Sequence, residues 1–195
     1  MNLLRFAILG FAALVVAACL PVTTKHPIGT TVGFKEDKAL LGMWKGRGED
    51  EDAKDAWFAF LRNADGSTTA IMMTSDPDGD DWGTFRLDLA TLGGNRIMNV
   101  HGGLKNGKPD DDEMSKQNIP FLYSFGADGT LTLSLLDEKA VAAAIQAGKI
   151  AGTVEKSSMG DVTITAEPAA LDAFFATKEG AALFSSKLVT LKRVN

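Results

Sequence analysis

Short stretches of alternating apolar and polar residues recur along this chain, and they limit it to a mainly β fold. In residues 84–90, for example, Phe85, Leu87 and Leu89 alternate with polar side chains. A period of two places the apolar residues on one face of a strand. Turns that contain glycine separate such stretches, as in the sequence Gly-Ala-Asp-Gly at 126–129. This combination is typical of antiparallel hairpins.

The pattern predicts about nine short strands, the first over 41–47 and the last over 188–194. Two short helices are expected before the last strand, where apolar residues recur at helical spacing, over 137–147 and from Pro168 to near Gly180. Strands that meander in sequential hairpins favour an antiparallel up-and-down barrel or a barrel-like sheet, because closure removes exposed edges.

The N-terminal residues have the layout of a secretory signal peptide. Arg5 precedes an apolar run over 6–16, and small residues follow it. The run is shorter than the roughly 20 apolar residues that a membrane-spanning helix needs. Cys19, directly after the small residues, is the single cysteine of the chain.

The sequence Val16-Ala17-Ala18-Cys19 resembles the lipobox of bacterial lipoproteins. In that family the cysteine thiol is joined to diacylglycerol, the chain is cut before the cysteine, and the new N-terminus is acylated. The resemblance implies that residues 1–18 are a signal peptide and that Cys19 carries fatty chains such as palmitate. The alternative is an ordinary secretory signal with an incidental cysteine. Leu20 stands where an Asp retains enterobacterial lipoproteins at the inner membrane, so we expect the periplasmic face of the outer membrane.

Composition divides the remaining chain into a tether and one domain. Residues 19–33 are rich in Thr, Pro and Gly, and we expect an extended lipidated tether that reaches at most about 40 Å. Residues 34–195 are expected to form a single β-barrel-like domain, since the 195-residue chain is 45% hydrophobic. The net charge of −5 argues against a nucleic-acid partner. Acylation of Cys19 would leave no thiol for disulfides, catalysis or metal binding.

The sequence Gly42-Met43-Trp44 at the first expected strand resembles the motif that begins lipocalins and fatty-acid-binding proteins. In those barrels the tryptophan closes one end and packs under an arginine of the last strand, and Arg193 is placed for that role. The alternative is that Trp44 is an ordinary core aromatic. The whole layout resembles small bacterial lipoproteins of uncharacterised function with a lipocalin-like barrel.

Residues for catalysis are sparse. Within the domain His101 is the one candidate base, and no Gly-x-Ser-x-Gly elbow accompanies it. A hydrolase stays an open alternative, because the fold could bring two carboxylates together for glycoside hydrolysis. No phosphate-binding loop or dinucleotide motif is present, so we expect no cofactor. An enzyme is therefore the least favoured class.

Two acidic stretches invite a metal-binding interpretation. Asp76, Asp78 and Asp80 have the spacing of a calcium loop, but Asp81 stands where an EF-hand needs Gly and Leu87 where it needs a carboxylate. The run Asp110-Asp-Asp-Glu113 is typical of a solvated loop. We expect no metal site.

Two non-catalytic roles remain. In the favoured one, the barrel is a membrane-anchored interaction or accessory domain whose partner is an envelope protein. In the alternative, it binds a small apolar or amphiphilic ligand inside the barrel. The residues expected to line that ligand site are Phe85, Leu87, Leu89, Leu131 and Leu133. The first role is favoured because this inward set is bulky and no polar group converges on it, whereas an enclosed apolar cavity above roughly 300 Å³ would favour ligand binding.

Overall fold

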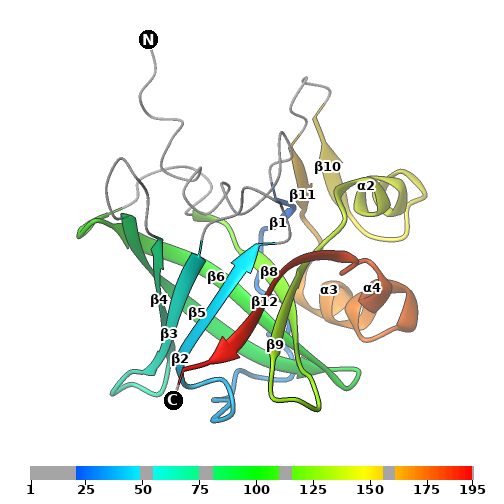
Figure 1. Cartoon of the computed structure of the whole chain (residues 1–195). Helices are drawn as coiled ribbons and strands as arrows, with labels where there is room; N and C mark the ends of the chain where they lie inside the picture. The colour runs from blue at the N-terminus through cyan, green and yellow to red at the C-terminus, as the bar shows by residue number, and fades with distance from the viewer. Residues whose placement is uncertain (1–20, 49–54, 75–80, 110–115, 156–160, 195) are drawn as a thin grey trace.

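Eight antiparallel strands close into a barrel (Figure 1). The computed structural model describes residues 21–48, 55–74, 81–109, 116–155 and 161–194. The barrel strands are β2 (Gly42–Gly48), β3 (Asp55–Arg62), β4 (Thr68–Thr74), β5 (Asp81–Leu92), β6 (Asn95–Lys105), β8 (Ile119–Phe125), β9 (Leu131–Leu135) and β12 (Ser186–Arg193). Each strand pairs with the next in this order, and β12 pairs with β2 to close the ring. The predicted fold class, a mainly β antiparallel barrel with a few short helices, is confirmed.

A layer of helices and short strands is inserted between β9 and β12. Its elements are α2 (Glu138–Gln146), β10 (Gly152–Val154), β11 (Val162–Ile164), α3 (Pro168–Phe175) and α4 (Lys178–Ala182). Asp137 caps α2 by accepting a hydrogen bond from the Ala140 amide, and Gly148 follows the helix with a φ of 69°. The single helix expected from Pro168 is two helices, because Thr177 leaves the helical conformation and caps α4 instead.

The inserted layer lies against one side of the barrel and creates a second hydrophobic core (Figure 1). The first core fills the barrel, and the second lies between the barrel wall and the layer. Barrel residues Leu92 and Ile97 belong to the second core together with Leu171 and Phe175 of α3. The sequence did not reveal this second core, because its members are spread over both the barrel strands and the insertion.

The N-terminal part of the described chain is bound to the domain, which differs from the extended tether expected over 19–33. β1 (Thr23–Thr24) pairs in parallel with β11 and extends the small sheet to the order β1-β11-β10. Val22 is 2% exposed and Ile28 is fully buried, both in the second core. We call residues 22–40 the strap. Burial of these two apolar side chains holds it in place.

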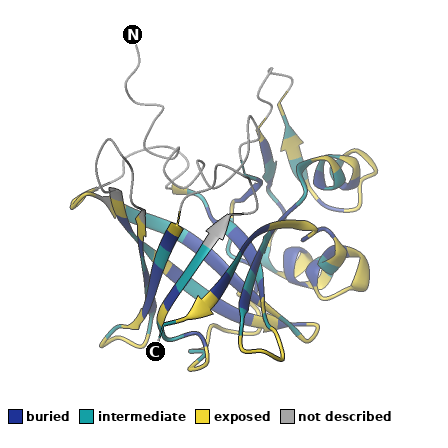
Figure 2. Ribbon diagram, viewed as in Figure 1, coloured by how far each residue is buried: buried dark blue, intermediate teal, exposed yellow. Residues whose placement is uncertain are grey.

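Burial divides the barrel wall into a covered and an uncovered side (Figure 2). The wall formed by β2, β3, β4 and β5 carries exposed positions on its outside, whereas the inserted layer covers part of the wall near β6 and β8. A further two-residue strand, β7 (Lys108–Pro109), pairs with the end of β6. Among the described helices none is long and apolar enough to cross a membrane.

Candidate functional site

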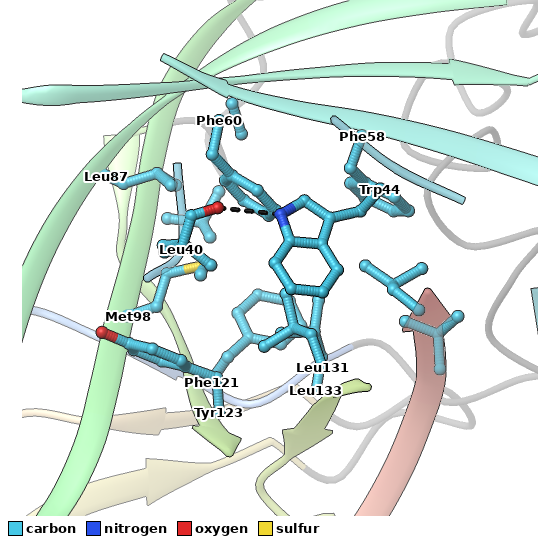
Figure 3. Close-up of a cluster of buried hydrophobic side chains, with 14 of the residues drawn as sticks. Leu40, Trp44, Phe58, Phe60, Leu87, Met98, Phe121, Tyr123, Leu131 and Leu133 are labelled. Carbon is cyan, nitrogen blue, oxygen red and sulfur yellow. Dashed lines mark hydrogen bonds between the residues drawn. The ribbon is translucent and has the colours of Figure 1, made fainter. Parts of the chain in front are cut away.

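The residues expected to line a ligand site do face the barrel interior, but they fill it. Leu87, Leu89, Leu131 and Leu133 are at most 4% exposed, and Phe85 packs against the same core. Aromatic side chains from β3 and β8 occupy the space between them, as Figure 3 shows for Phe58, Phe60 and Phe121. The cavity that the described residues leave between Phe58, Phe85 and Phe121 measures about 20 Å³. That is room for about one water molecule.

One end of the barrel is closed by Trp44 and Arg193. Trp44 is 1% exposed, and its indole Nε1 donates a hydrogen bond of 2.8 Å to the carbonyl of Leu40 (Figure 3). The Arg193 guanidinium lies over the indole, 4.3 Å from the ring centroid. It also donates hydrogen bonds to the carbonyls of Leu41 (2.7 Å) and Ala39 (2.5 Å). The contact expected between Trp44 and Arg193 is therefore present, and a cation over an indole contributes about 0.5–2 kcal/mol.

A half-open pocket of about 370 Å³ lies beside this closed end, between the strap and strands β5, β6 and β8. Three of its polar groups pair within the protein: Arg96 Nε is 3.2 Å from Asp37 Oδ2, and the Tyr123 hydroxyl donates to the same carboxylate at 3.0 Å. Burial raises the pKa of the Tyr123 hydroxyl, and the negative charge of Asp37 raises it further. These pairs satisfy one another, so they fasten the strap to the barrel end and do not converge on the pocket.

His101 has a carboxylate partner but no nucleophile. Its Nε2 lies 3.1 Å from Oδ2 of Asp88, on the outside of β5 and β6. An acyl-transfer site would also need a hydroxyl or thiol within hydrogen-bond reach of the imidazole. The structure shows no such contact of His101 within the ranges it describes.

The structure does not test the acidic stretches or the lipidation site. Asp76, Asp78, Asp80 and the run 110–113 lie outside the described residues, as does Cys19. Within the described residues, no three His, Cys, Asp or Glu side chains come close enough together to hold a metal ion.

Two buried polar side chains fix the strap, and the sequence analysis did not single them out. Asn99 is fully buried on β6; its side chain accepts from the Ile28 amide and donates to the Ile28 carbonyl, both at 2.8 Å. Asp172 of α3 is 3% exposed and accepts from the amides of Gly29 (2.6 Å) and Thr31 (2.7 Å). Both side chains replace water at backbone groups that would otherwise be buried without partners.

Large apolar side chains are exposed on the uncovered wall. Of seven such residues in the described chain, five lie on β2 to β6: Met43, Leu61, Met73, Trp82 and Leu104. They are 37–46% exposed. The sequence carried a signal for one of them, Leu61, because the stretch over 56–62 is apolar on both faces, whereas a strand with one solvated face alternates. Clusters of exposed apolar residues mark interaction sites more often than single ones do.

Comparison with protein-family models, with curated proteins and with solved structures found no match for this chain. The site must therefore be interpreted from its own geometry. That geometry consists of a filled barrel, one closed end, a strap held by buried polar groups, and an apolar outer wall.

Proposed function

We propose that this protein is a lipoprotein of the bacterial cell envelope, anchored through acylated Cys19, and that its barrel acts by its surface as a non-catalytic interaction domain. The lipobox resemblance at Val16-Ala17-Ala18-Cys19 supports the anchor. Leu20, which stands where an Asp would retain the protein at the inner membrane, supports a location on the periplasmic face of the outer membrane. Two or more acyl chains hold a protein firmly on a bilayer, because each buried methylene contributes about 0.8 kcal/mol.

The observation that carries the surface role is the filled interior. A ligand pocket for a small molecule measures about 300–1,000 Å³, and the cavity that the described core residues leave between them measures about 20 Å³. Binding inside the barrel, which the lipocalin-like resemblance implies, would require several core side chains to move. The exposed apolar side chains on the outer wall need no such rearrangement.

Lipid labelling tests the anchor. Labelled palmitate should enter the wild-type protein in bacterial cells and be absent from Cys19→Ala. Label that persists in the variant, or a mature chain that begins at another residue without fatty chains, would contradict the proposal.

Photo-crosslinking tests the surface role. A crosslinking residue at Met43 or Leu61, both exposed on the outer wall, should join the protein to an envelope protein in living cells. Thr153 of β10 is also exposed but lies on the inserted layer, so the same residue there should give no such product. Saturable binding of a fluorescent fatty acid by the purified protein, with no crosslinks from the wall, would favour the ligand-binding alternative.

A further inference from the structure

The strap runs along the outside of the barrel from one end to the other. Thr24 exchanges two backbone hydrogen bonds with Asn118, directly before the start of β8. Ile28 is bonded to Asn99, farther along the wall, and Asp37 contacts Tyr123 near the end closed by Trp44. Followed backwards from Thr24, the chain therefore leaves the domain at the end opposite Trp44, which we call the open end.

This path leaves almost no slack between the domain and the proposed anchor. The described chain begins at Pro21, and Val22 is already buried. Leu20 alone separates Pro21 from Cys19. Two residues span at most about 7 Å, so an acylated Cys19 would hold the open end directly at the bilayer surface.

Exposed apolar side chains stand at this same end. Met73 and Trp82 face each other across β4 and β5, each next to the last described residue of its strand at the open end. Leu104 lies one residue before the end of β6. We call these three residues the rim patch. They are 37%, 40% and 39% exposed.

The backbone of Trp82 is bonded to the turn that follows β6. The Trp82 amide donates to the Asn106 side chain at 3.1 Å, and the Asn106 amide donates to the Trp82 carbonyl at 3.0 Å. The indole lies over Gly107, where an added Cβ would be 3.7 Å from Trp82 Cζ2. A fixed Trp with apolar neighbours is the type of side-chain group that sits at the headgroup level of a bilayer. Lys108 is exposed in the adjoining strand β7.

We propose that the rim patch inserts into the headgroup region of the bilayer that carries the acyl chains, so that the barrel stands on the membrane with its open end down. This inference rests on the proposed lipid anchor. The lipid class follows from charge, because the chain carries 25 acidic and 20 basic residues and a net charge of −5. Like charges repel, so the surface fits zwitterionic headgroups better than anionic ones.

Tryptophan quenching by brominated lipid tests the orientation. The full chain, purified from bacterial envelopes with its Cys19 mass determined, is reconstituted into phosphatidylcholine vesicles with or without bromine on the acyl chains. Trp57→Phe is the background of every sample, because Trp57 on β3 pairs with Met73 and lies at the same end. In this background Trp82 should be quenched, and the further change Trp82→Phe should remove most of the bromine-dependent signal, because the remaining Trp44 is 1% exposed and lies near the far end. Quenching by brominated lipid should also become weaker when anionic phosphatidylglycerol replaces phosphatidylcholine at low salt, because the like charges are then poorly screened.

A matched control uses Phe34 on the strap. Phe34 is 41% exposed, close to the 40% of Trp82, but it precedes Lys35, whose amide bonds to Leu89 in the half of the barrel nearer Trp44. Phe34→Trp in the background that carries both Trp57→Phe and Trp82→Phe should show no bromine-dependent quenching.

The outcomes separate this inference from the anchor it rests on. One outcome would refute the orientation and leave the anchor intact. In it Cys19 is acylated and the protein floats with the vesicles, but either Trp82 is not quenched or the tryptophan introduced at position 34 is quenched. If Cys19 is unmodified and the protein stays in solution, the anchor and the orientation both fall.

Discussion

Asp172 is the side chain whose removal should release the strap most selectively. Its carboxylate accepts from the Gly29 amide and from both the amide and the hydroxyl of Thr31. Gly29 is buried, so Asp172→Ala leaves its amide without a partner and without water. The loss of a hydrogen bond to a charged group costs about 1.5–3 kcal/mol when no water can take the place of that group. Thr31 is exposed and can bond to water, so it adds little. We therefore expect a loss of about 1.5–3 kcal/mol, a sizeable fraction of the 5–15 kcal/mol typical of a domain.

Two measurements on the same variant check this expectation. Urea unfolding followed by tryptophan fluorescence gives the loss in free energy of unfolding. Trypsin should also cut after Lys35 or Lys38 faster than in the wild type, because the strap opens locally before the domain unfolds.

Asp137→Ala is the matched control, since Asp137 lies on the same inserted layer and caps α2 through the Ala140 amide at 2.8 Å. Loss of that cap should cost about 1 kcal/mol and leave strap cleavage unchanged. An Asp172→Ala variant that is no less stable than Asp137→Ala, with unaltered cleavage after Lys35, would refute the reasoning.

Two further predictions concern the β5–β6 turn and the buried phenol. Gly93 and Gly94 both have positive φ angles (57° and 84°), but a Cβ on Gly93 would lie 2.5 Å from the Ala176 carbonyl oxygen, whereas one on Gly94 meets nothing within 4 Å. Gly94→Ala should therefore lower the free energy of unfolding by about 1 kcal/mol through backbone strain alone, and Gly93→Ala should lower it by clearly more. Equal losses of the two variants in urea unfolding would show that the turn does not contact the end of α3 closely. Tyr123 is the only tyrosine, and its pKa is raised in the folded protein by burial and by Asp37. Absorbance of tyrosinate at alkaline pH should therefore rise in the unfolded chain before it rises in the native one. Because the pKa of Tyr123 is higher in the folded protein, the contribution of the neutral phenol to the free energy of unfolding is complete below the pKa of the unfolded phenol. It is lost as the pH rises from there towards the pKa of the folded protein. Titration of Tyr123 in the native protein at the ordinary tyrosine pKa would contradict this.

The barrel strands were predictable because each carries its own local signals. Alternation over 84–90 fixed the inward face of β5, and the Gly-containing turn at 126–129 fixed the hairpin of β8 and β9. Asp137 and Gly148 marked both ends of α2. Such signals act within a few residues and need no knowledge of the rest of the fold.

The strap and the rim patch were not predictable from local signals. The strap has the Thr, Pro and Gly content of a linker, and it is held largely by its backbone, which bonds to Asn99 and Asp172 far along the chain. Nothing in the sequence near Asn99 says that its amide will be buried. For Trp82, the strand alternation gives the outward direction, but that it would stand beside Met73 depends on the register of β4 and β5.

Closure of the barrel joins residues from opposite ends of the chain, since Trp44 on β2 lies opposite Arg193 on β12. Contacts between residues so far apart in sequence slow folding, because the loop between them must be ordered first. A chain that emerges N-terminus first would present two unpaired strand edges, those of β2 and β9, until β12 has been made. Such edges invite mispairing with other chains. Closure of the barrel must therefore wait for β12, which follows the other seven barrel strands in the chain.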